Sequence, residues 1–243
     1  MPDIATIIEE RVSFSGVAGQ IEGMLAYPEH DEPQESLLIV GPHPMLGGDF
    51  ENNVVRELAD LFAERRCLTL RFNFRGVGQS DGAAILSTDN IAEFWARSRI
   101  SDEQGFAEDT ASAADFLITT FDQVSHVVGY SFGAWLGSRW ASESVNRRQS
   151  DEAPTTATDV RSVTLVAPTI SQHDYSHMTR LNLPKLVIAS SDDFAVPADD
   201  LRRQFADWSD PKELILEDVD NHFFRGHEAW LSDQVSTFLR GET

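Results

Sequence analysis

The chain has only one cysteine and no long apolar stretch, and both features restrict the classes of protein to which it can belong. One cysteine excludes an intrachain disulfide, and Cys67 leads into an apolar run that suits a small core residue. No stretch approaches the roughly 20 apolar residues of a membrane-spanning helix. The first residues, Met1 to Ile4, lack the basic and apolar regions of a signal peptide. We therefore expect a cytoplasmic protein.

Basic residues are also scarce. The chain has 19 lysines and arginines against 40 acidic residues, for a formal net charge of −21, and only Lys185 and Lys212 are lysines. A surface of this sign repels polyanions, so we expect neither nucleic acid nor an anionic membrane as a partner. The acidic surface either keeps the protein soluble or adapts it to salt, which screens self-repulsion.

The length and patterning predict one α/β domain over residues 1–243. Alternating apolar and polar residues over 11–15 and 20–27 predict a β-hairpin. After it, strands and helices alternate, which predicts a mainly parallel, doubly wound sheet of about eight strands with right-handed crossovers. The later strands are expected at 36–40, 68–72, 124–128, 163–166, 186–189 and 214–216, and the helices at 52–65, 106–121, 132–140, 174–181, 201–208 and 227–240.

Two segments stand apart from this alternation. Residues 83–105 form a long connection that carries Phe94 and Trp95, and such a connection is either a lid or a surface excursion. Residues 143–160 are polar and predict a surface insertion. The connection after the strand at 163–166 is too short for a large cap domain.

The pentapeptide at 129–133 organises the chain, because it stands where an apolar strand passes into a helix. Its G-x-S-x-G pattern predicts a nucleophile elbow, a tight turn that holds the serine hydroxyl clear of the sheet. The glycines leave room for the strand and helix to approach, and the helix N-terminus supplies N–H groups for an oxyanion. The residues are Gly129, Tyr130, Ser131, Phe132 and Gly133.

A serine nucleophile needs a base, and the base needs an acid to orient it. In an elbow fold, the acid and then the histidine follow the serine along the chain. Asp192 and Asp193 come directly after one later strand, and His222 follows the last strand, so all three lie at the edge that holds Ser131. The spacing does not decide whether Asp192 or Asp193 is the acid that orients the base. The other histidines fit this order or position less well.

The loop after the strand at 36–40 is expected to supply the second oxyanion donor. Pro44 has no N–H group, so the donor is Met45 or Leu46, together with Phe132. His43 either braces this loop or contacts substrate, and Leu46 and Tyr130 are further substrate-binding candidates. No metal site is expected, since an H-E-x-x-H pattern is absent, and the lone G-x-G at 76–78 does not predict a phosphate site.

These motifs resemble the α/β-hydrolase superfamily over nearly the whole chain. They are most similar to its small, dienelactone-hydrolase-like branch, which has no large cap domain. The resemblance implies that the acid precedes x-x-V-P, which selects Asp193. Dienelactone hydrolases themselves carry a cysteine nucleophile where this chain has Ser131, and 83–105 is not part of the family core. The matching segments are 43–48, 71–80, 129–133, 193–197 and 221–224.

The resemblance implies a serine hydrolase of small to medium carboxylic esters with a Ser131–His222–Asp193 triad and no cofactor. Thioester or amide hydrolysis and acyl transfer use the same triad and stay open. A non-catalytic protein that binds a hydrophobic ligand in the same pocket is the alternative from another class. The expected partner is a small acyl ester, and a homodimer is left open.

Overall fold

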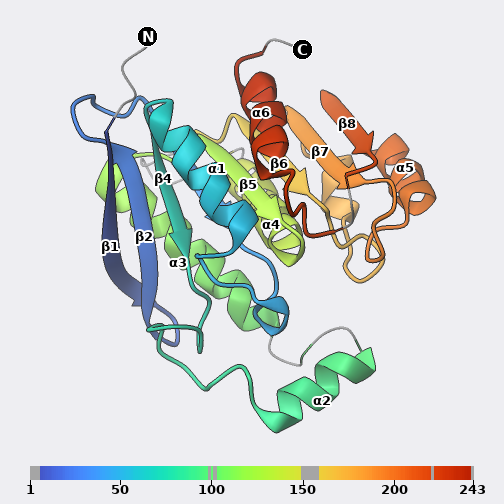
Figure 1. Cartoon of the computed structure of the whole chain (residues 1–243), viewed down its shortest axis with the longest axis horizontal. Helices are drawn as coiled ribbons and strands as arrows, with labels where there is room; N and C mark the ends of the chain where they lie inside the picture. The colour runs from blue at the N-terminus through green and yellow to red at the C-terminus, as the bar shows by residue number, and fades with distance from the viewer. Residues whose placement is uncertain (1–5, 98–99, 101–102, 149–158, 220–221, 242–243) are drawn as a thin grey trace.

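An eight-stranded sheet forms the centre of the molecule (Figure 1). The computed structural model describes residues 6–97, 100, 103–148, 159–219 and 222–241. The strand order is β1-β2-β4-β3-β5-β6-β7-β8, with antiparallel pairing from β1 to β2 and β2 to β4 and parallel pairing from there on. The predicted sheet and its opening hairpin are thereby confirmed. The strands are β1 Ile7–Gly16, β2 Gly19–Pro28, β3 Glu35–Val40, β4 Cys67–Phe72, β5 His126–Tyr130, β6 Ser162–Val166, β7 Lys185–Ser190 and β8 Lys212–Glu217.

Helices cover both faces of the sheet. In Figure 1, α1 and α6 lie over one face and α3 and α4 over the other. Side chains alternate along a strand, so Leu37 of β3 packs in the α1 and α6 core while Leu38 packs in the α3 and α4 core. The helices are α1 Asn53–Glu64, α2 Thr88–Arg97, α3 Glu103–Phe121, α4 Phe132–Arg148, α5 Ala198–Asp207 and α6 Glu228–Leu239, with short 3₁₀ helices η1 Pro44–Leu46 and η2 Ser176–Thr179.

The helix α2 stands apart from both layers, at the lower end of the view in Figure 1. It lies within the segment 83–105, for which the sequence predicts only a long connection, so this helix is an addition to the predicted elements. No helix in the described part of the chain has the length and hydropathy needed to cross a bilayer.

The polar stretch 143–160 begins inside a helix. Helix α4 continues to Arg148, so residues 143–148 are helical where a surface insertion is predicted. Residues 149–158 of that stretch lie outside the described residues. The helix expected at 174–181 is the shorter η2.

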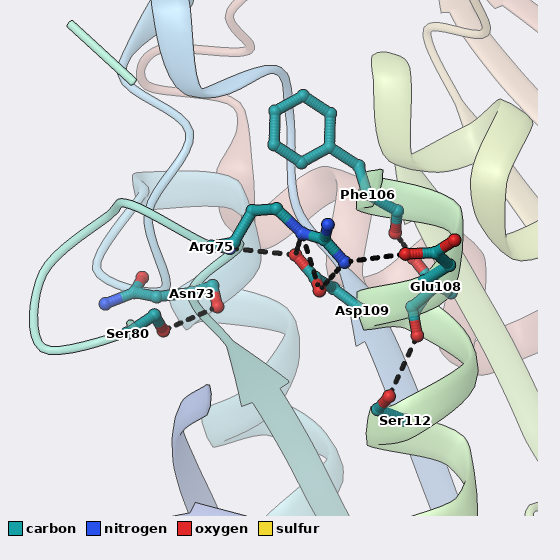
Figure 2. Close-up of polar contacts among 8 residues, drawn as sticks. Asn73, Arg75, Ser80, Phe106, Glu108, Asp109 and Ser112 are labelled. Atoms are coloured by element: carbon teal, nitrogen blue, oxygen red, sulfur yellow. Dashed lines mark hydrogen bonds and ion pairs between the residues drawn. The ribbon is translucent and has the colours of Figure 1, made fainter. Parts of the chain in front are cut away.

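An ion pair ties the loop after β4 to α3 (Figure 2). The guanidinium of Arg75 contacts the carboxylate of Asp109 at 2.8–3.1 Å, and Asp109 also accepts the backbone N–H of Arg75 at 2.8 Å. Glu108 adds a further contact with Arg75 at 3.0 Å. Because Asp109 is fully buried, this pair fixes the start of α3 beside the carboxyl edge of the sheet. The two glycines of the G-x-G in this loop, Gly76 and Gly78, have left-handed backbone conformations.

Candidate active site

Ser131 stands on the turn between β5 and α4. Its φ of 57° lies in the left-handed region, which a residue with a side chain adopts only at some cost. A Cβ on Gly129 would come within 2.3 Å of the carbonyl oxygen of Gly133. The backbone N–H of Ser131 donates to the carbonyl of Val166 at 2.8 Å, which ties the turn to the neighbouring strand β6. The turn therefore has the tight, strained geometry that its sequence predicts.

Ser131, His222 and Asp193 meet at the carboxyl edge of the sheet. Oγ of Ser131 lies 2.9 Å from Nε2 of His222, and Nδ1 of His222 lies 2.8 and 3.0 Å from the two carboxylate oxygens of Asp193. A carboxylate on Nδ1 fixes the hydrogen there, so Nε2 presents its lone pair to the serine hydroxyl. All three residues are buried, whereas Asp192 is exposed. The geometry brings Asp193, not Asp192, to the imidazole.

The backbone of His222 is held by Tyr130. The Tyr130 hydroxyl donates to the carbonyl oxygen of His222 at 3.0 Å, and burial, together with the charge of Asp193, raises the pKa of that hydroxyl. Rings of Phe194 and Phe223 pack against the imidazole at 5.3 and 5.7 Å between centroids. Tyr130, a substrate-binding candidate in the sequence, is therefore a brace for the histidine and is not among the described residues that line the pocket.

The N–H groups expected to hold an oxyanion differ in their surroundings. Phe132 is the first residue of α4, where no carbonyl of the helix can accept its N–H. The N–H of Met45 donates to Nδ1 of His43 at 3.1 Å, and that of Leu46 donates to the His43 carbonyl at 2.8 Å. His43 therefore holds the loop in place, which is one of the two roles that the sequence analysis allows for this residue. Met45 already has a partner in this structure.

A pocket of about 180 Å³ opens over the serine hydroxyl. Its mouth is apolar, since Leu46 is 41%, Trp95 77% and Phe194 67% exposed. The pocket is lined by His43, Leu46, Phe94, Trp95, Ser131, Phe132, Thr169, Gln172, His173, Phe194, Ala195 and His222. Of the substrate-binding candidates, His43 and Leu46 line it.

Part of this lining was not predicted. Phe94 and Trp95 reach the pocket from α2, so the segment 83–105 contributes directly to the site. Thr169 and His173 reach it from the connection after β6. Sequence order excludes His173 as the base, but β6 ends at the same edge as β5, and this topology alone would have marked the loop as a pocket wall.

Comparisons with known proteins agree with this fold. The uncharacterized protein RP471 from Rickettsia prowazekii (strain Madrid E) is 26% identical over 240 residues, which cover 94% of this chain and 88% of that protein. The crystal structure of ATU1826 from Agrobacterium tumefaciens, a protein of unknown function, has a TM-score of 0.75 at 27% identity and covers 96% of this chain and 98% of that chain. An alpha-beta serine hydrolase homologue from Coxiella burnetii has a TM-score of 0.72 at 26% identity, covering 96% of this chain and 97% of its own.

A model of the alpha/beta hydrolase family matches residues 37–240, which is most of the chain and includes every residue of the site. The chain therefore belongs to the alpha/beta hydrolase family.

Proposed function

We propose that this protein is a serine hydrolase that cleaves small to medium carboxylic esters. The observation that carries the proposal is the continuous contact from Ser131 Oγ through the His222 imidazole to the Asp193 carboxylate, 2.9 Å on one side and 2.8 Å on the other. The serine hydrolase homologue from Coxiella burnetii supports the same class of nucleophile.

In the proposed reaction, Nε2 of His222 takes the hydroxyl proton as Ser131 Oγ attacks the acyl carbon. Asp193 stabilises the imidazolium that forms. The imidazolium then gives its proton to the departing alcohol oxygen, which leaves the acyl group on Oγ. A water molecule attacks this ester while His222 takes its proton, and the acid departs as Ser131 regains a hydrogen.

The oxyanion of each tetrahedral intermediate needs donors on the side of Oγ away from the base. The N–H of Phe132 is the first donor that we propose, since Phe132 directly follows Ser131 as the first residue of α4 and no carbonyl of that helix can accept its N–H. Met45 is the second donor that we propose. Its N–H group either donates to the oxyanion and to Nδ1 of His43 together, or leaves Nδ1 of His43 and donates to the oxyanion alone.

The size of the site favours esters with modest acyl groups. A volume of about 180 Å³ and an apolar mouth suit a short alkyl or single-ring group. Thioesters, amides and acyl acceptors other than water would use the same three side chains, so a substrate panel distinguishes these reactions.

The test compares Ser131→Ala with the parent on p-nitrophenyl acetate and butyrate. We expect kcat to fall by about 10⁴-fold or more and labelling by a fluorophosphonate probe to disappear. Ser138→Ala is the matched control, because Ser138 also contacts a histidine, His177 at 2.9 Å, but lies outside the pocket. An unchanged rate in Ser131→Ala would rule out the proposal. A folded parent that does not react with the probe would favour the non-catalytic alternative.

A further inference from the structure

Exposed apolar side chains gather at the opening of the pocket above Ser131. Leu46, Trp95 and Phe194 line this pocket, and two more such residues belong to the segment 83–105, which carries Trp95. Exposed apolar surface that collects in one place marks a site where an apolar ligand or partner binds. In the part of the chain that the structure describes, the large exposed apolar residues are Val17, Leu46, Leu86, Ile91, Trp95 and Phe194.

Phe194 directly follows the acid of the triad. The backbone N–H of Ala195 donates to Oδ1 of Asp193 at 2.8 Å, so the turn that places this carboxylate also directs the Phe194 side chain. The Phe194 ring lies 5.3 Å from the His222 imidazole between centroids, and 67% of the residue is exposed. Phe194 therefore packs on the base and still presents most of its surface at the pocket mouth.

Two other rings pack on the same imidazole. Tyr130 lies 5.8 Å and Phe223 5.7 Å from the His222 ring between centroids. Neither of them is among the described residues that line the pocket, whereas Phe194 is. Of these three rings around the base, Phe194 is therefore the one that a substrate in the pocket can contact.

The proposed reaction brings the alcohol portion of the ester to the base. Nε2 of His222 gives its proton to the departing alcohol oxygen, and such a transfer needs about 2.6–3.2 Å between the two heavy atoms. This nitrogen lies 2.9 Å from Oγ of Ser131, which lines the pocket. The group that the alcohol oxygen carries therefore begins beside the imidazole on which Phe194 packs.

The lining of the pocket favours a neutral alcohol. No aspartate, glutamate, lysine or arginine is among the described residues that line it. An ionic group on the alcohol would lose water there without gaining a counter-charge. An apolar group, by contrast, is favoured when it leaves water and covers the exposed surface of Phe194.

We infer that Phe194 determines specificity by binding an apolar group on the alcohol portion of the substrate. The preferred substrates are then esters of neutral, apolar alcohols. This inference rests on the proposed function and adds the class of alcohol to it.

Trp95 is an exposed aromatic residue of the same pocket with different surroundings. It lies on α2 beside Phe94, whose ring packs on His43 at 4.9 Å between centroids. His43 in turn accepts the N–H of Met45, the second oxyanion donor of the proposed reaction. Trp95 therefore belongs to the wall that holds the oxyanion loop, while Phe194 packs on the base, and this difference makes Trp95 a matched control.

The experiment compares ethyl butyrate with 2-phenylethyl butyrate. The two esters share an acyl group and both release a primary alcohol, so the ratio of their kcat/KM values reports the binding of the alcohol portion. In the parent we expect this ratio to favour 2-phenylethyl butyrate by about 10-fold to 100-fold. Phe194→Ala should reduce the ratio to below about threefold, and Phe194→Leu, which keeps an apolar side chain, should give an intermediate ratio.

The controls separate binding of the alcohol from support of the base. Val17→Ala, which removes a side chain that is 71% exposed outside the pocket, should keep the parent ratio. If Phe194 merely braced His222, Phe194→Ala would slow both esters equally, and an unchanged ratio in that variant overturns the inference. A parent ratio near one overturns it too, as does a fall in Trp95→Ala that equals or exceeds the fall in Phe194→Ala.

Binding to Ser131→Ala distinguishes this inference from the proposed reaction. Without the nucleophile, calorimetry measures the binding of the two intact esters, and an apolar contact stabilises the bound ester and the transition state alike. Tighter binding of 2-phenylethyl butyrate, lost in Ser131→Ala/Phe194→Ala and kept in Ser131→Ala/Trp95→Ala, supports the role of Phe194 even if the parent hydrolyses neither ester. Equal binding of the two esters contradicts it even if the parent is an esterase.

Discussion

Gly133 lies so close to Val40 that a Cβ at position 133 would come within 2.0 Å of the Val40 carbonyl oxygen. Val40 is the last residue of β3, and Gly133 is the second residue of α4. The positive φ of this turn belongs to Ser131, and neither Gly129 nor Gly133 has one. The glycines of the elbow are thus needed for space, because helix α4 must cross the end of β3 at backbone contact to hold the serine at the sheet edge.

Gly133→Ala should destabilise the fold and displace the elbow. Overpacking typically costs about 1–3 kcal/mol, and we expect at least the upper end of this range here, since the clashing atom is a backbone oxygen. Gly41→Ala is the control, because a Cβ there would meet its nearest atom at 3.6 Å. Urea unfolding and ester hydrolysis measure both effects. Equal unfolding free energies for the two variants would contradict this account of the close approach.

Much of the fold could be predicted because parallel strands leave clear signals. Runs such as Leu37–Val40 are buried on both faces, and loops that follow parallel strands meet at one edge. That rule alone brings Ser131, an aspartate after β7 and His222 together. The choice between Asp192 and Asp193 could not come from topology, since adjacent residues at a strand end share the edge. The resemblance to the family selects Asp193 through the x-x-V-P that follows it, and the structure agrees, because Asp193 is the carboxylate that turns inward.

The pocket walls were harder to predict. Ile91, Phe94 and Trp95 have the i, i+3, i+4 spacing of a helix face, but only Phe94 is buried, so α2 shows little of the usual contrast between a core face and a solvent face. The partner of the Met45 N–H was also beyond the sequence. A histidine before Pro44 can point in several directions, and only the packing of its ring on Phe94 and Phe132 fixes Nδ1 over the loop.

Asp193→Asn should reduce kcat by about 10⁴-fold, because an amide can leave His222 in the wrong tautomer and cannot stabilise the imidazolium. Asp192→Asn removes the same charge one residue away. It should keep kcat within about twofold of the parent, since Asp192 is exposed and, of the two aspartates, Asp193 is the one that contacts the imidazole. Steady-state rates on p-nitrophenyl butyrate decide this. A larger loss in Asp192→Asn than in Asp193→Asn would reverse the assignment.

Asp109→Ala should destabilise the protein by about 3–5 kcal/mol, because it leaves the largely buried Arg75 guanidinium without its main counter-charge. Glu108→Ala removes the more exposed partner of the same arginine and should cost at most about 1 kcal/mol. The free energies come from urea unfolding at pH 7. Similar losses in the two variants would mean that the contact of Figure 2 does not hold α3 in the way described.

The burial of His43 should make the protein less stable as the pH falls. The native state keeps this ring neutral down to about pH 4, while the unfolded chain takes up a proton near the ordinary value of 6.5. The contribution of the neutral His43 ring to the free energy of unfolding is therefore fully present above pH 6.5. It is lost as the pH falls toward 4, by about 2 kcal/mol between pH 7 and 5. Relative to His43→Asn, which lacks this proton uptake, the parent should lose that much more unfolding free energy over the interval. Parallel pH profiles in urea unfolding would show that His43 is protonated in the native state.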